Sequence, residues 1–166
     1  MSEVETNYRL DRPVDEARDH ILGPANAEIT LVEYGSYACP HCRAANERIA
    51  QVRDQFGDRL RYVFRQRPLT DSDIARRAAE LAERCGTQRF WDIHVELMTR
   101  SETLTEDDLR AVTQELGLTK ADPQEATAAE LRAKARVDED MRSARASGVM
   151  ITPYMEIGRA SCRERV

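Results

Sequence analysis

The pattern of hydrophobic and polar positions changes period along the chain. Residues 29–34 and 60–64 are short runs rich in β-branched and aromatic residues, which is typical of core strands. Between them, apolar residues recur at spacings of three and four up to Gly57, as in an amphipathic helix. The stripe consists of Cys42, Ala45, Ile49, Val52 and Phe56. Because two strands joined by a helix form a β-α-β unit, we expect parallel strands and a right-handed crossover.

From residue 71 onwards the pattern is helical for most of the remaining chain. The spacing predicts helices over residues 74–85, 90–98 and 106–116, and either two helices or one bent helix over 123–147. Thr105 is expected to be the N-cap of the third helix, with Asp108 at N3 as its partner in a capping box. The switch from strand period to helical period predicts an α/β fold with an all-helical insertion over about residues 70–147.

Two of the four cysteines stand where the first predicted strand gives way to its helix, in the stretch Cys39-Pro40-His41-Cys42. With Cys39 as N-cap, Pro40 falls at N1, where a missing N–H is no loss, and Cys42 falls at N3. Free backbone N–H groups and the helix dipole would then stabilise a thiolate at Cys39. We therefore expect Cys39 to be the exposed catalytic nucleophile, and Cys42 the shielded catalytic residue that resolves a mixed disulfide. Such an exchange requires no metal and no organic cofactor.

Two other interpretations of the cysteine pair, a zinc site and a structural disulfide, have less support from the sequence. A zinc site needs two further ligands, and the remaining histidines and cysteines form no second pair at ligand spacing. A structural disulfide between Cys39 and Cys42 would close so small a loop that it removes little entropy from the unfolded chain. The motif is therefore interpreted as redox-active.

Three further side chains have chemistry that could matter. His41, beside the Cys39 sulfur, would favour the thiolate as a donor or partial cation; the alternative is a solvated residue at the helix N-terminus. Cys85 completes an apolar stripe and is interpreted as an inert buried thiol. His94 is interpreted as a packed ring with one bonded nitrogen.

The composition sets limits on size, partners and location. A chain of 166 residues with 41% hydrophobic content is long enough for one core, and a net charge of -5 gives no basic field for nucleic acid or an anionic membrane. No apolar run approaches the length of a bilayer span, and residues 1–6 lack the features of a signal peptide. We therefore expect a cytoplasmic protein whose partners are thiol or disulfide substrates, either proteins or small molecules.

The residues around the cysteines resemble those of the DsbA-like thiol–disulfide oxidoreductases. Val32-Glu33-Tyr34-Gly35 comes before the Cys39-Pro40-His41-Cys42 tetrapeptide, and Ile151-Thr152-Pro153 follows the helical region. The resemblance implies a thioredoxin-like fold with a helical insertion and a thiol–disulfide oxidoreductase activity. It also implies that Thr152 and Pro153 join the site, with a cis bond between them and Thr152 against the backbone of bound substrate.

The chain is predicted to fall into three parts: a flexible arm over residues 1–18, an incomplete DsbA-like domain over 19–155, and a non-native tail over 156–166. The tail resembles the conceptual translation of a sequencing-library adapter and lacks a strand or helix pattern. By the family resemblance, further strand and helix should follow Pro153. We therefore expect the final strand or strands and the closing helix to be missing.

Three functions remain open from the sequence. The main hypothesis is a thiol–disulfide oxidoreductase, with the direction of the reaction undecided. One alternative is a non-catalytic regulatory thioredoxin-like domain of a larger protein, as occurs appended to sodium/proton antiporters. The other is a glutathione-dependent transferase or isomerase of related fold, against which Cys42 argues because those enzymes typically lack the second cysteine.

Overall fold

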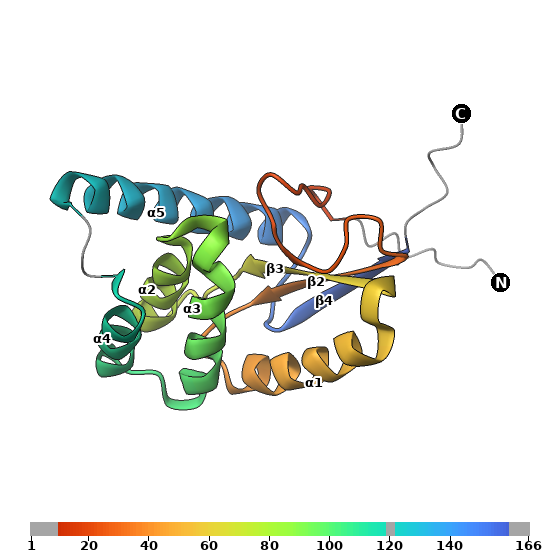
Figure 1. The fold of residues 1–166 in the computed structure, drawn as a ribbon, viewed down its shortest axis with the longest axis horizontal. Coiled ribbons are helices and arrows are strands. Elements are labelled where there is room, and N and C mark those ends of the chain that lie inside the picture. The colour runs from red at the N-terminus through yellow and green to blue at the C-terminus, as the bar shows by residue number, and fades with distance from the viewer. Residues whose placement is uncertain (1–9, 119–121, 160–166) are drawn as a thin grey trace.

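A computed structural model describes residues 10–118 and 122–159 as one mixed sheet with helices around it (Figure 1). The strands are β1 (His20–Leu22), β2 (Ile29–Gly35), β3 (Leu60–Gln66) and β4 (Tyr154–Arg159). The α-helices are α1 (Pro40–Phe56), α2 (Asp73–Glu83), α3 (Gly86–Arg100), α4 (Glu106–Glu115) and α5 (Pro123–Ala146). Single turns of 3₁₀-helix, η1 (Gly57–Arg59) and η2 (Ser101–Thr103), follow α1 and α3.

The sheet has the strand order β1-β3-β2-β4. The central strands β2 and β3 are parallel, with Ile29 opposite Leu60 and Gly35 opposite Gln66, and α1 joins them. The β-α-β prediction is therefore confirmed. Strands β1 and β4 pair antiparallel with β3 and β2 respectively. The sequence pattern missed β1 because three residues are too few to establish an alternation.

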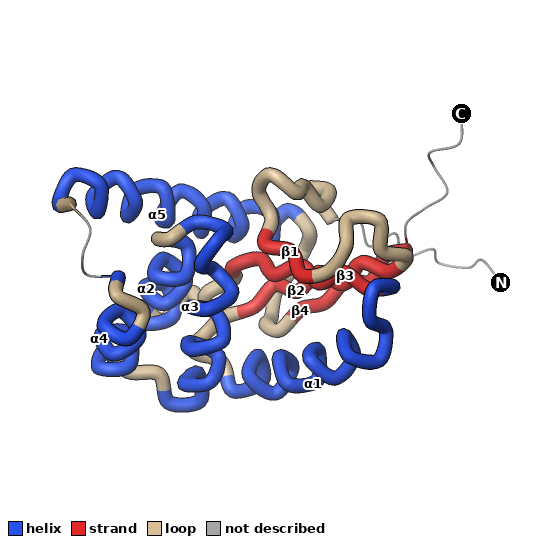
Figure 2. Tube along the Cα trace, viewed as in Figure 1, coloured by secondary structure: helices blue, strands red, loops and turns tan. Residues whose placement is uncertain are grey.

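Each face of the sheet has its own core. Side chains alternate along β2, so Leu31 packs among the residues of α1 and α3, whereas Val32 and Tyr34 pack with Ala144 of α5. Figure 1 shows α1 and α5 on opposite sides of the sheet, with α2, α3 and α4 gathered at one end. Figure 2 shows the strands side by side between these helices. The start of α1 therefore lies on the Leu31 face.

The helical insertion follows the predicted pattern. Helices α2 to α5 run between Asp73 and Ala146, and the Ala-rich region forms one continuous helix of 24 residues. Thr105 is the N-cap of α4: its side chain accepts from Asp108 N–H at 3.2 Å, and the Asp108 carboxylate accepts from Thr105 N–H at 2.8 Å. The capping box found in the sequence is thus confirmed.

The predicted N-terminal arm is not loose where the structure describes it. Residues 10–18 lie against the α5 face of the sheet, where Leu10 and Val14 pack on the core. The Arg12 guanidinium pairs with Asp140 at 2.9 Å, and buried Arg65 donates to the Arg12 carbonyl oxygen at 3.0 Å. The prediction of a flexible arm is wrong for these residues because buried polar contacts hold them, and such contacts leave no hydrophobic periodicity in the sequence.

Strand β4 extends through part of the predicted non-native tail. Tyr154 lies opposite Tyr34, and the pairing with β2 continues as far as Arg159. Backbone pairing does not require particular side chains, so residues of the predicted tail can extend a strand. The apolar side chains of Met155 and Ile157 on this strand are 39% and 75% exposed. Residues 160–166 lie outside the described residues. The incomplete domain and the non-native tail stay predictions.

Candidate active site

The cysteine motif forms the first turn of α1. Cys39 is the N-cap, with extended backbone, and its sulfur accepts a hydrogen bond from Cys42 N–H at 3.2 Å. Pro40 stands at the first helical position, as the spacing predicts. The arrangement directs the Cys42 backbone N–H and the positive end of the helix dipole at the Cys39 sulfur.

Cys39 is less exposed than we expected. Its exposure is 5%, compared with 0% for Cys42, so the prediction of an exposed Cys39 is wrong. The loop before β4 covers it: Thr152 Oγ1 lies 3.8 Å from the Cys39 sulfur, and the Thr152 carbonyl oxygen lies 3.9 Å from it. The Thr152–Pro153 peptide is cis, which confirms that prediction. His41, in contrast, is exposed on the first turn of α1.

Cys42 lies behind Cys39 and is fully buried. Burial raises the pKa of the Cys42 thiol, and the contact with Cys39 raises it further, while a hydrogen bond from Ser36 N–H at 3.5 Å opposes the shift. In the dithiol form Cys42 therefore keeps its proton at neutral pH. The resolving step requires that proton to leave, so the site needs a proton acceptor near Cys42.

Glu33 supplies a candidate acceptor that sequence reasoning missed. It lies on β2 on the same sheet face as Leu31 and is 0% exposed. Burial raises the pKa of Glu33 to about 7, against a lowering by the Tyr62 hydroxyl, which donates to Oε2 at 2.5 Å. The Glu33 charge in turn raises the pKa of Cys42, which indicates that the two groups interact. An acid at an inward position of an alternating strand was the available signal.

Glu33 also has spare hydrogen-bonding capacity. Its Oε1 atom is buried and has no hydrogen-bond partner among the described residues. A Cβ added at Gly35 would lie 3.1 Å from this oxygen. The space beside Oε1 therefore depends on the missing side chain of Gly35, and it leaves the acid able to take up a proton.

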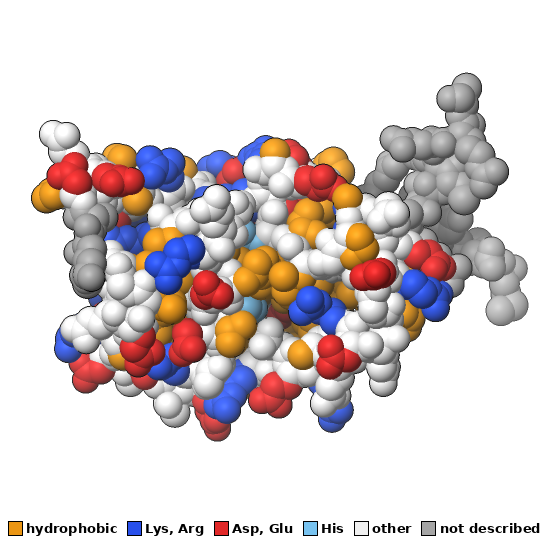
Figure 3. Space-filling view, in the orientation of Figure 1, with side chains coloured by type: hydrophobic (Ala, Val, Ile, Leu, Met, Phe, Trp, Pro, Cys, Tyr) orange, Lys and Arg blue, Asp and Glu red, His pale blue; other side chains and the backbone are white. Residues whose placement is uncertain are grey.

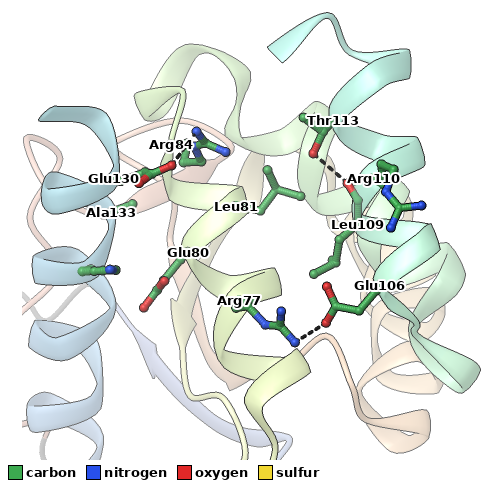
Figure 4. A pocket seen from close by; sticks show the side chains of 11 residues that line it. Arg77, Glu80, Leu81, Arg84, Glu106, Leu109, Arg110, Thr113, Glu130 and Ala133 are labelled. Carbon is green, nitrogen blue, oxygen red and sulfur yellow. Dashed lines mark hydrogen bonds and ion pairs between the residues drawn. The ribbon is translucent and has the colours of Figure 1, made fainter. Parts of the chain in front are cut away.

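Another hollow, of about 380 Å³, lies away from the cysteines between α2, α4 and α5 (Figure 4). Two ion pairs span it, Arg77 with Glu106 and Arg84 with Glu130, and Leu81 lies between them. Because the cysteine motif does not line this hollow, the two features are separate.

The surface and the charged groups add little further chemistry. Within residues 10–118 and 122–159, no three His, Cys, Asp or Glu side chains come together to hold a metal ion. In the same part of the chain, no helix is long and apolar enough to cross a membrane. On the face in Figure 3, acidic and basic side chains are interspersed around a central apolar area.

Comparison with known proteins gives the family and the fold. A family model described as thioredoxin matches residues 15–164. The thiol-disulfide exchange protein alpha-DsbA2 of Wolbachia pipientis has a TM-score of 0.70 with this chain at 19% identity, over 86% of this chain and 77% of that one. The fold prediction, a thioredoxin-like sheet with a helical insertion as in DsbA-like proteins, is confirmed.

Sequence relatives include a Nitrosospira multiformis protein named as the Na(+)/H(+) antiporter NhaA. It is 58% identical over 147 residues, which is 87% of this chain but 23% of the relative. The chain therefore spans less than a quarter of that relative's length.

The comparisons correct the predicted location. A periplasmic thioredoxin-like protein from Salmonella enterica serovar Typhimurium has a TM-score of 0.65 at 20% identity, over 89% of this chain and 87% of that one. A cytoplasmic location, expected from residues 1–6, is contradicted by this likeness.

Proposed function

Because the chain belongs to the thioredoxin family and carries a cysteine pair at a helix N-terminus, we propose that it is a thiol–disulfide oxidoreductase that acts through Cys39 and Cys42. The observation that carries the proposal is the hydrogen bond from Cys42 N–H to the Cys39 sulfur, with the Cys42 thiol buried behind it. The substrates are thiols or disulfides, and the cysteine pair itself is the redox group, with no added cofactor.

The exchange proceeds in two displacements. The Cys39 thiolate attacks one sulfur of a substrate disulfide, so that a mixed disulfide forms and the other substrate sulfur leaves as a thiolate. Cys42 then loses its proton and attacks the Cys39 sulfur, which forms the Cys39–Cys42 disulfide and releases the second substrate thiolate. The substrate gains two electrons and the pair loses two; the reverse sequence oxidises a substrate dithiol.

Glu33 is the acceptor in this proposal for the Cys42 proton. A carboxyl group with a pKa of about 7 is about half ionised at neutral pH, so it can take up a proton and later return it. Its complete burial keeps solvent water from its carboxyl group. The ionised form also opposes a second negative charge on Cys42, so deprotonation of Cys42 and protonation of Glu33 favour each other.

The remaining predicted residues support the pair. Pro40 fixes the start of α1, and Thr152 and Pro153 form the wall beside the Cys39 sulfur, where substrate backbone would lie. His41 stands exposed where an entering substrate passes. We place the reaction outside the cytoplasm, in keeping with the periplasmic protein of similar fold.

The test is trapping of the mixed disulfide. In a Cys42→Ser variant the thiol proposed to resolve the bond at Cys39 is absent, so covalent adducts with disulfide substrates should accumulate and disappear with reductant. Cys85→Ser is the matched control, because Cys85 is a free thiol outside the motif, and it should leave exchange unchanged. The absence of adducts on Cys42→Ser, with the wild type also unable to reduce a disulfide, would refute the proposal.

A second candidate rests on the antiporter relative. The match to the antiporter covers 87% of this chain and only part of the antiporter. The chain could therefore be a regulatory domain whose dithiol state controls a larger protein. This role needs a reversible disulfide but no turnover on free substrates. Catalytic turnover with a model disulfide therefore separates the two candidates.

A further inference from the structure

His94 occupies an unexpected position next to the cysteine motif. It lies on α3, in the helical insertion, and is 2% exposed. Its Nδ1 is 2.9 Å from the Tyr37 hydroxyl, and its Nε2 is 3.3 Å from Asn46 Oδ1. Tyr37 comes two residues before Cys39 and Asn46 four residues after Cys42. One side chain from the insertion therefore bridges the two ends of the motif, where the sequence suggested only one bonded nitrogen.

The hydrogen bonds at both ends fit a single tautomer. Burial, together with the charge of the neighbouring His20, lowers the pKa of His94 to about 3, so the ring is neutral at physiological pH. A neutral imidazole has one donor and one acceptor. Since Asn46 presents its oxygen, Nε2 carries the hydrogen and Nδ1 accepts from Tyr37. Burial raises the pKa of Tyr37, which keeps its hydroxyl protonated and able to donate.

Aromatic packing fixes the ring in this orientation. Its neighbours lie edge-on or tilted at centroid distances of 4.6 to 5.5 Å, and they are Phe64, Trp91, Phe90 and Tyr37. Tyr37 itself is 0% exposed and packs against Phe64. Because these rings hold the imidazole in place, His94 can hold Tyr37 and Asn46 in position and does not simply move with them.

We propose that His94 is a positioning residue for the exchange reaction, holding the loop before Cys39 to helix α1 through Tyr37 and Asn46. The inference rests on the proposed function. The bridge preserves two bonds to sulfur, from Cys42 N–H to Cys39 at 3.2 Å and from Ser36 N–H to Cys42 at 3.5 Å. The first of these bonds favours the reduced pair, because a backbone N–H stabilises a thiolate at Cys39 more than a disulfide sulfur. Loss of the bridge should therefore shift the pair toward the disulfide.

The first experiment compares two matched tyrosines. Tyr37→Phe removes the hydroxyl that meets His94, whereas Tyr34→Phe removes an equally buried hydroxyl on the other sheet face, where it contacts Ser143 and Arg65. The equilibrium constant of the cysteine pair is measured in glutathione redox buffers. Tyr37→Phe should shift it toward the disulfide by about fivefold, the worth of one hydrogen bond. Tyr34→Phe should lower stability but leave the constant within about twofold.

The second experiment tests the bridge as a unit. His94→Phe should shift the constant as far as Tyr37→Phe, and the double variant should shift it no further, because both remove the same connection. His94→Gln keeps an acceptor and a donor and should restore part of the effect. Additive shifts, or a Tyr37→Phe constant equal to that of Tyr34→Phe, would overturn the proposal.

A measurement on the wild-type protein tests the bridge even if the variants fail to fold. The imidazole nitrogen resonances of His94 should report hydrogen on Nε2 and a bare Nδ1, unchanged between about pH 5 and 8. The opposite tautomer, or a ring that titrates in this range, would refute the bridge. A wild-type pair that never equilibrates with glutathione would instead refute the proposed function, so the two failures are distinguishable.

Discussion

Replacing Glu33 by glutamine should make the protein more stable at neutral and alkaline pH. Glutamine has nearly the same shape, and its carbonyl oxygen can still accept the hydrogen bond from Tyr62, so packing is retained. What the change removes is the ability to ionise. Because Glu33 is 0% exposed, its ionised form is poorly solvated in the folded state.

The magnitude follows from the pKa of Glu33, which is about 7 in the folded protein against an ordinary 4.5. Below the ordinary value the acid is protonated in both states and has no effect. As the pH rises toward 7, the unfolded chain releases the proton and the folded protein retains it, so the folded state loses stability. The loss is complete above pH 7 and amounts to about 3 kcal/mol.

The assay is urea unfolding of the reduced proteins at several pH values between about 4 and 8. The difference in unfolding free energy between Glu33→Gln and the wild type should grow by about 3 kcal/mol across this range, since contributions from other titrating groups cancel. Glu28→Gln, which changes an exposed acid just before the same strand, is the control and should give a flat difference. A flat difference for Glu33→Gln as well would refute the buried-acid reasoning.

Three further substitutions test the packing around the site by urea unfolding. Asp19→Asn removes the partner of fully buried Arg65 and should cost about 3 to 5 kcal/mol, and a loss below about 1 kcal/mol would contradict the buried ion pair. Gly35→Ala should cost about 1 to 3 kcal/mol, because the new Cβ would lie 2.6 Å from a ring atom of Phe64, and wild-type stability would contradict that contact. Thr105→Ala should cost about 1 kcal/mol by loss of the α4 cap, and an unchanged midpoint would rule that cap out as a source of stability.

The sequence could predict the elements whose signals are local. The parallel strands around α1 and the capped start at Thr105 depend on periodicity and on residues within one turn, so their signals lie close together in the chain. The position of Cys39 as an N-cap could also be predicted, because the residues that identify an N-cap follow it directly in the chain. The exposure of Cys39 was misjudged because its cover, Thr152, comes from a distant part of the chain.

Other features depend on contacts that no local pattern encodes. The segment around Arg12 looked loose because its partners, Arg65 and Asp140, lie in β3 and α5. His94 was correctly placed in a packed environment, but its second hydrogen bond depends on how α3 lies against α1. In each case a polar side chain satisfies its hydrogen bonds across elements that are far apart in sequence, which only the tertiary structure determines.

The buried acids on the two faces of the sheet, Asp19 and Glu33, have opposite pKa shifts. On the α5 face, burial would raise the pKa of Asp19, but hydrogen bonds from Arg65 and the backbone hold it below its ordinary value, so the charge is compensated. On the cysteine face the one partner of Glu33 among the described residues is a neutral hydroxyl, and the ionised form of Glu33 destabilises the fold. The proposed use of Glu33 in proton transfer would explain an acid that weakens the fold. Glu33→Gln should therefore give a more stable protein that resolves mixed disulfides more slowly, on the order of a hundredfold. Asp19→Asn should give a less stable protein whose glutathione equilibrium is unchanged.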